Sequence, residues 1–233
     1  MAFGYDYANL NMQWLSQWDR FHAYNFALYG GYVDGCQFFD YQIGFGKNYH
    51  NTQRVISFHA APSLDFYAAP NTKYNDSLFS LSLMYGRKYG AFLPSVALEY
   101  VQVWTPGITE AGDTGAELRV SRGGYTSVEL PVGFRLNHTY RHRNVALTPE
   151  LRAFWVPQVA DRSSSLMTAF TAGGPNSPEF LVDSGDYGWQ HVRLGTGVTT
   201  RFNRIWSSSL NYDAALYSGS TRQTAGLSVT AMW

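Results

Sequence analysis

The end of the chain, from Trp189 to Trp233, alternates between two kinds of residue with a period of two. From Val192 to Phe202, every second residue is apolar or threonine, and the residues between them are small or charged. The same pattern begins again at Trp206 and once more near Ala225, after two brief turn segments. A period of two is that of a β-strand whose two faces meet different surroundings. The segment is therefore predicted to form three antiparallel strands.

Alternation alone does not say which face is wet, because a soluble barrel with an oily interior and a transmembrane barrel with a polar lumen share the same period. The polar positions mix glycine and serine with charges of both signs, which suits a watery lumen better than a solvated outer wall. The apolar rows often carry aromatic residues near their ends, as interfacial girdles do. The sequence therefore favours an all-β, antiparallel, transmembrane up-and-down barrel. The terminal row also resembles the carboxy-terminal signal of bacterial outer-membrane barrels; it comprises Leu227, Val229, Ala231 and Trp233.

Composition limits the possible partners. With 17 basic and 17 acidic residues among 233, the chain gives no electrostatic reason to expect nucleic acid. No run approaches the roughly 20 apolar residues of a membrane helix, and no motif predicts a cofactor, a metal site or a catalytic group. The single cysteine, Cys36, excludes an intramolecular disulfide framework. No basic, apolar secretory leader follows Met1.

The connections between the alternating segments predict the orientation of the barrel. About ten strands are expected, with short connections near residues 34, 88, 141 and 203 and long ones near 15, 62, 114 and 173. Short periplasmic turns and longer external loops are typical of outer-membrane barrels. The hairpin at 218–221 is the exception, being external yet brief. Pro131 should force a bulge or a lost ladder bond, and Leu118 and Val120 are expected to extend the strand that follows them.

Several segments resemble the carboxy-terminal translocator domain of type V secretion autotransporters. They span nearly the whole chain in the family's order: Leu28 to Tyr32, Phe38 to Gly46, Pro94 to Tyr100, Thr148 to Trp155, Leu210 to Asp213 and Gly226 to Trp233. The resemblance implies an outer-membrane barrel of twelve strands around an α-helix, which anchors and exports an N-terminal passenger. The family's first strands, its helix, the passenger and the signal peptide have no counterpart here. Residues 1–233 are therefore interpreted as one N-terminally truncated barrel domain.

Charged residues at the polar positions are the candidate lumen lining. They are Asp40, Glu99, Glu129, Arg135, Glu150, Arg152, Arg193, Arg201 and Asp213. By the resemblance, they hold a linker helix or let an extended passenger chain slide. The alternative is that they pair across neighbouring strands for stability alone. An arginine facing lipid at mid-membrane costs about 2 to 4 kcal/mol, so Arg135 and Arg193 set which face is the lumen.

The resemblance also implies the partners: outer-membrane lipids, the passenger or its linker helix, and the barrel-assembly machinery. The assembly machinery would recognise the terminal row, aided by an exposed strand edge. Three other classes stay open, namely a small passive porin, a ten-stranded outer-membrane enzyme of the omptin type and a soluble lipid-binding barrel. The enzyme class is disfavoured because Asp40, Asp213 and His191 do not group on this strand map, so the chain is predicted not to be an enzyme.

Overall fold

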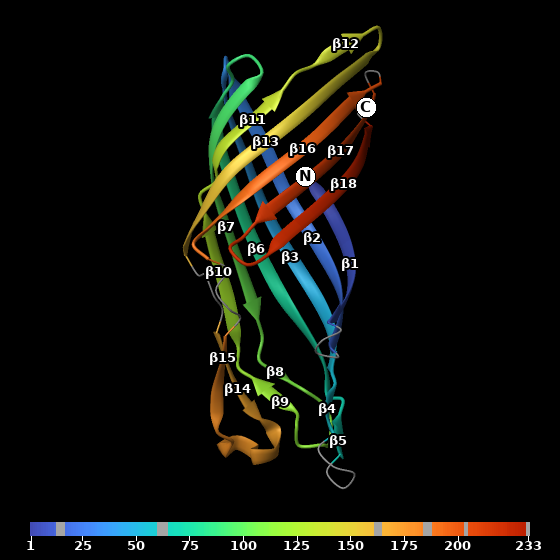
Figure 1. Ribbon diagram of the computed structural model, residues 1–233, viewed down its shortest axis with the longest axis vertical. Helices are drawn as coiled ribbons and strands as arrows, with labels where there is room; N and C mark the ends of the chain where they lie inside the picture. Colours follow the sequence, from blue (N-terminus) through green and yellow to red (C-terminus); the bar gives the residue numbers. More distant parts are fainter. Residues whose placement is uncertain (13–16, 60–64, 161–164, 184–187, 203–204, 232–233) are drawn as a thin grey trace.

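The computed structural model describes residues 1–12, 17–59, 65–160, 165–183, 188–202 and 205–231. One large antiparallel sheet curls into a tall barrel, and smaller strands project from one end of it (Figure 1). The barrel strands are β1 (Ala2–Met12), β2 (Gln17–Asp34), β3 (Gln37–Arg54), β6 (Asn71–Arg87), β7 (Phe92–Thr105), β10 (Gly123–Glu129), β11 (Val132–Asn137), β12 (Tyr140–His142), β13 (Val145–Ala160), β16 (Gln190–Arg201), β17 (Trp206–Leu216) and β18 (Thr221–Ala231).

The order around the sheet is β1-β2-β3-β6-β7-β10-β13-β16-β17-β18. This gives ten positions, as the alternation predicts. β11 continues β10 beyond Pro131, and the register on β13 shifts between Val128 and Glu129. The bulge expected near the proline is thus present. Among the described residues β1 and β18 form no ladder with each other, so both are edges of the sheet.

The connections differ in length between the two ends of the barrel. At one end β2 joins β3, and β6 joins β7, through tight turns; Gly35 and Gly90 there have positive φ angles of 57° and 63°. At the other end, residues 55–59, 65–70, 106–122 and 165–183 carry additional structure. The brief 217–220 hairpin is closed by a hydrogen bond from Tyr217 N to Ser220 O. The expected turn at Asn203 and the expected loop residue Pro62 lie outside the described residues.

Two expectations about loops are wrong. The connection near residue 15 is not long, because β1 and β2 pair residue for residue out to Met12 and Gln17. Leu118 and Val120 do not extend β10. They form β9 (Leu118–Val120), which pairs with β8 (Ile108–Thr109) and β14 (Ser165–Phe170) instead. The backbone leaves the barrel wall there, since Ser121 N donates to Met167 O on β14.

The structures outside the barrel are a hairpin and a small sheet. β4 (Ile56–His59) and β5 (Asp65–Ala68) form the hairpin, and β15 (Glu179–Asp183), β14, β9 and β8 form the sheet in that order. A short 3-10 helix, η1 (Thr171–Asn176), joins β14 to β15. All of these strands gather at the end of the barrel that carries the long connections (Figure 1).

The outer wall of the barrel is apolar and exposed. Leu151, Leu210 and Leu227 are 56%, 55% and 76% accessible on the outward face, far more than a soluble core allows. Aromatic residues border this band. Tyr24 contacts Tyr5 and Tyr49 with ring centroids 5.3 and 6.0 Å apart toward the long-loop end. Tyr32, Phe39 and Tyr85 lie exposed toward the tight turns. Such a band between two girdles is the lipid-facing surface of a membrane barrel.

No helix among the described residues is long and apolar enough to cross a membrane.

Candidate functional site: the charged lumen

One arginine joins three strands on the inner face of the barrel. Arg193 on β16 donates through Nη1 to Glu99 Oε2 on β7 at 2.7 Å, and through Nη2 to Glu129 Oε2 on β10. β13 lies between β16 and β10, and its side chains Phe154 and Val156 are buried. A side chain reaches that far only across the concave side of a curled sheet. The contact therefore identifies the inner face and places three of the candidate residues on it.

This cluster solves a charge problem that the strand register creates. Glu99 and Glu129 are directly opposite each other on β7 and β10. Like charges at opposed positions repel. Arg193 touches both carboxylates, and its Nε also donates to Nε2 of His191 at 3.1 Å. The cation is thus held by groups from three separate strands.

A second cluster forms around Arg152 on β13. Its Nη1 donates to Glu150 at 2.7 Å, and its Nη2 donates to both carboxylate oxygens of Asp213 on β17 at 3.0 and 3.1 Å. Gly195 on β16 lies between Arg152 and Asp213 in the same row of the sheet. A Cβ at Gly195 would meet Asp213 Oδ1 and would lie 2.7 Å from Arg152 Nε. The glycine therefore leaves the space through which the ion pair crosses β16.

The other three candidate charges do not join these clusters. Asp40 is exposed at the tight-turn end, beside Gly31. Arg135 donates to Met84 Sδ at 3.4 Å, while its buried Nε has no hydrogen-bond partner among the described residues. Arg201 is exposed near the end of β16 and makes no ion pair with any other described residue.

A cavity of about 910 Å³ opens beside the first cluster. Sequence reasoning missed most of its lining, including Tyr125, Gln158, Tyr217 and Arg222. The side chain of Arg222 makes no hydrogen bond or ion pair with another residue in the described part of the chain. The alternation of β18 places Arg222 on the polar face, which was the signal available in the sequence. Because Tyr217 belongs to the hairpin at the long-loop end, the cavity lies in that half of the lumen.

A histidine cluster, also missed, lies on the inner face toward the long-loop end. His50 on β3 contacts Asp19 on β2 through Nδ1 at 3.0 Å and Asp76 on β6 through Nε2 at 3.1 Å. Its ring stacks on Tyr74 with centroids 4.5 Å apart. The two imidazole nitrogens point to different carboxylates, so the cluster ties three strands together without forming a convergent ligand set.

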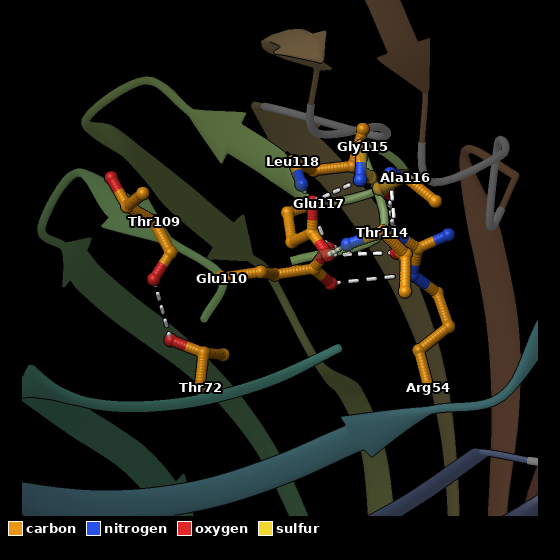
Figure 2. A network of polar contacts seen from close by, with 9 residues as sticks. All are labelled: Arg54, Thr72, Thr109, Glu110, Thr114, Gly115, Ala116, Glu117 and Leu118. Atoms are coloured by element: carbon orange, nitrogen blue, oxygen red, sulfur yellow. Dashed lines mark hydrogen bonds and ion pairs between the residues drawn. The ribbon is translucent and has the colours of Figure 1, made fainter. Parts of the chain in front are cut away.

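A polar network attaches the segment between β7 and β10 to the barrel (Figure 2). Arg54, at the end of β3, makes a two-point contact with Glu110, with Nε to Oε1 at 3.2 Å and Nη2 to Oε2 at 2.7 Å. Glu110 also accepts the Leu118 N–H at 2.8 Å. Two-point contacts between arginine and carboxylate fix direction as well as distance. The network therefore sets the height of this segment above the barrel mouth.

Glu117 organises the same segment from within. Its carboxylate accepts hydrogen bonds from Thr114 N, Thr114 Oγ1 and Gly115 N at 2.8 to 2.9 Å (Figure 2). The backbone hydrogen bond from Thr114 is the main cause that lowers the pKa of Glu117 below its usual value. The charged carboxylate is thus part of the turn.

The terminal row lies on the outer face of an unpaired edge. Leu227 and Val229 are 76% and 66% accessible on β18, and Ala231 is the last residue of that strand. Trp233 lies outside the described residues.

Together, an apolar outer band, aromatic girdles and a charged interior define an outer-membrane β-barrel. The model of the family described as "Autotransporter beta-domain" matches residues 1–213 of the chain. The chain therefore belongs to the autotransporter β-domain family, whose barrels reside in the outer membrane of Gram-negative bacteria. The family is not a class of enzymes.

Similarity to one solved structure supports the fold. The β domain of the Bordetella autotransporter BrkA superposes with a TM-score of 0.60 at 19% identity, over 98% of this chain and 78% of that one. The translocator domain of the autotransporter NalP from Neisseria meningitidis gives 0.49 at 11% identity, over 98% and 85%. No curated protein sequence matches the chain.

Proposed function

We propose that this barrel anchors an N-terminal passenger and exports it through the charged lumen. The observation that carries the proposal is the cavity of about 910 Å³ on the inner face, which is lined both by paired charges and by Arg222, whose side chain makes no ion pair with a described residue. A polar, partly hydrated lumen accepts a hydrophilic chain without a strong apolar trap. Family membership supports an outer-membrane translocator role.

The two charged clusters have a defined part in this function. Arg193 and Arg152 are neutralised by carboxylates of the wall, so they keep the barrel wall together. Arg222 lines the cavity and makes no ion pair of this kind with any residue that the structure describes. It supplies the charge that a passing chain, or a helix resting in the lumen, meets with its own carboxylates.

The test places one crosslinking group inside the barrel and one outside. A leader and a cysteine-bearing passenger that stalls during export are fused before residue 1, and Cys36 is replaced by serine. Thr224, which lines the cavity, and its neighbour Ala225, on the opposite face of β18, are replaced in turn by cysteine. We expect the passenger to reach the cell surface, where added protease cleaves it, and to crosslink to T224C but not to A225C.

Each alternative gives a different result. A passenger that stays protected from external protease overturns export, and ion conductance without export identifies a passive porin. Equal crosslinking of T224C and A225C overturns passage through the lumen even if the passenger is displayed.

The terminal row suggests how the barrel is inserted. We propose that Leu227, Val229, Ala231 and Trp233 are recognised by the barrel-assembly machinery, aided by the unpaired edge of β18. Replacing Val229 by asparagine should lower the amount of inserted barrel in cells while leaving refolding of purified protein in detergent unchanged. Equal loss in both assays would assign the row to stability alone.

A further inference from the structure

The outer wall changes character just beyond the aromatic girdle at the long-loop end. On β2 the outward row Tyr24, Phe26 and Leu28 faces lipid, and the period of two carries the same face on to His22 and Arg20. Strand pairing places Asn9, Arg20, Asn51 and Lys73 side by side in one row across β1, β2, β3 and β6. The next row toward the membrane is Tyr7, His22, Tyr49 and Asn75. We call these eight residues the girdle patch.

The girdle patch is cationic and lacks counter-charges. The carboxylates near the patch on the same strands point to the inner face, where Asp6 accepts from Asn25 and where Asp19 and Asp76 contact His50. The side chain of Lys73 forms no hydrogen bond or ion pair with any residue that the structure describes. Arg20 stacks over Trp18 at 5.1 Å, which leaves the edge of its guanidinium available for acceptors.

The surface of the patch is hollowed. A depression of about 570 Å³ is lined by Tyr7, Arg20, His22, Tyr49, Asn51 and Lys73, among others. Arg20 and Lys73 are two strands apart, about 10 Å along the row. The depression thus presents two separated cations, with the amide of Asn51 between them and the phenol groups of Tyr7 and Tyr49 in the row nearer the membrane.

The height of the patch in the membrane selects the ligand. Tyr5, Tyr24 and Tyr49 mark the interface, where aromatic rings lie at the level of lipid headgroups. The patch begins at this level on the long-loop side, which is external in outer-membrane barrels. Anions at that level are the phosphates of outer-leaflet lipid. Asparagine side chains add hydrogen bonds suited to sugar hydroxyl groups.

We propose that the girdle patch binds the phosphorylated diglucosamine headgroup of a lipopolysaccharide molecule in the outer leaflet. Arg20 and Lys73 each contact a phosphate, and Asn51, placed between them in the row, faces the sugar. The two cations thus match a lipid that carries two phosphates on a sugar pair better than one with a single phosphodiester. This inference depends on the outer-membrane location of the barrel and is independent of export.

The test measures lipid retained by the full chain. Wild type and R20Q/K73Q are refolded into phosphatidylethanolamine nanodiscs that contain equal mole fractions of diphosphoryl lipid A, dephosphorylated lipid A or phosphatidylglycerol. The lipid that remains bound after extraction into detergent is counted by native mass spectrometry. Each interfacial cation contributes about fivefold to anionic-lipid binding, so the double variant should retain roughly 30-fold less diphosphoryl lipid A.

A matched control replaces two exposed cations at the opposite end of the barrel. R141Q/R143Q removes the same charge from the tight-turn side and should retain diphosphoryl lipid A as wild type does. Circular dichroism and heat-shifted gel mobility establish that every variant is folded. Equal loss in R141Q/R143Q, unchanged retention in R20Q/K73Q, or equal retention of dephosphorylated lipid A or phosphatidylglycerol would each overturn the proposal.

Discussion

The inner face of the barrel differs between two regions. From β1 to β3 its side chains are mostly small or neutral, and from β7 to β17 they include clusters of charged residues. On β2 and β3 the inner face within the lipid-facing band carries small or neutral residues such as Ala23, Asn25 and Gly44. On β7, β10, β13, β16 and β17 it carries the arginine and carboxylate clusters. We call these the small wall and the charged wall.

The difference shows two ways of stabilising a wide barrel. The small wall relies mainly on backbone ladders and on contacts between neighbouring strands, such as Asn25 Nδ2 to Asp6 Oδ2 at 2.8 Å. The charged wall fills part of the lumen and links strands that are not neighbours. Removing one charged partner from such a network lowers the stability of the fold more than removing a neutral contact does.

The largest expected effect comes from breaking the charged wall at its centre. In R193Q the opposed carboxylates of Glu99 and Glu129 lose their shared cation. We expect the free energy of unfolding to fall by about 3 kcal/mol, because an unpaired charge remains partly buried. Urea unfolding in detergent micelles, followed by tryptophan fluorescence, measures this. The control R201Q removes an exposed, unpaired charge from the same strand and should change stability by less than about 0.5 kcal/mol. A similar effect of both variants would contradict the distinction between the walls.

The second-largest effect tests whether the ion pair between Arg152 and Asp213 needs the space above Gly195. G195A inserts a methyl group between Arg152 and Asp213, which should separate the ion pair and cost about 2 kcal/mol. G226A, on the inner face of β18, meets no atom within 4 Å and should be neutral. The same unfolding assay compares the two. If G195A is as stable as wild type, the pair does not need the space that the glycine provides.

The sequence predicts the walls but not which charges meet. Alternation separates the two faces of each strand, because a strand turns each side chain through half a revolution. The glycines, serines and mixed charges on one face then assigned that face to the lumen, and the sequence so predicted the ten-stranded barrel. Pairing between Arg193 and Glu99 depends on how tightly the sheet curls, since the two strands are three places apart. Nothing in the local sequence encodes that curvature. The grouping of Asp19, His50 and Asp76 was missed for another reason, because it depends on the register of three neighbouring strands.

External segments were less predictable, for a different reason. Leu118 and Val120 read as a continuation of β10, yet their backbone hydrogen bonds go to β8 and β14. The partner β14 is distant in the chain, and tertiary pairing overrides a local pattern in short strands. The prediction of a long loop near residue 15 was wrong in the opposite sense. The polar side chains there indicated a loop, yet β1 and β2 stay paired beyond the membrane, out to Met12 and Gln17.

A smaller effect should come from the contact that attaches the loop of the charged wall to the small wall. R54Q removes the two-point contact between β3 and Glu110. We expect the free energy needed to open residues 106–122 locally to fall by about 1.5 kcal/mol, while the free energy of unfolding of the barrel changes little. Limited trypsin digestion of the folded barrel reports this, because Arg119 and Arg122 become cleavable about tenfold faster. The matched control K73Q, on neighbouring β6, removes a cation without this contact and should digest as wild type does. Faster digestion of both variants would contradict a specific tether.

The smallest expected effect tests how tolerant the small wall is. In G44A the new Cβ is crowded by the hydroxyl of Ser80 alone, which can rotate away, and its other neighbours lie at ordinary contact distances of 3.8 and 3.9 Å. At Gly195 it meets both partners of an ion pair. Replacing glycine by alanine within a strand also reduces the entropy of the unfolded chain. We therefore expect a change of less than about 0.5 kcal/mol for G44A in the urea assay. The double variant G44A/S80A removes the hydroxyl and should match or exceed wild type. A loss at G44A comparable to that at G195A would show that the small wall is packed as tightly as the charged wall, and the contrast between them would then rest on charge alone.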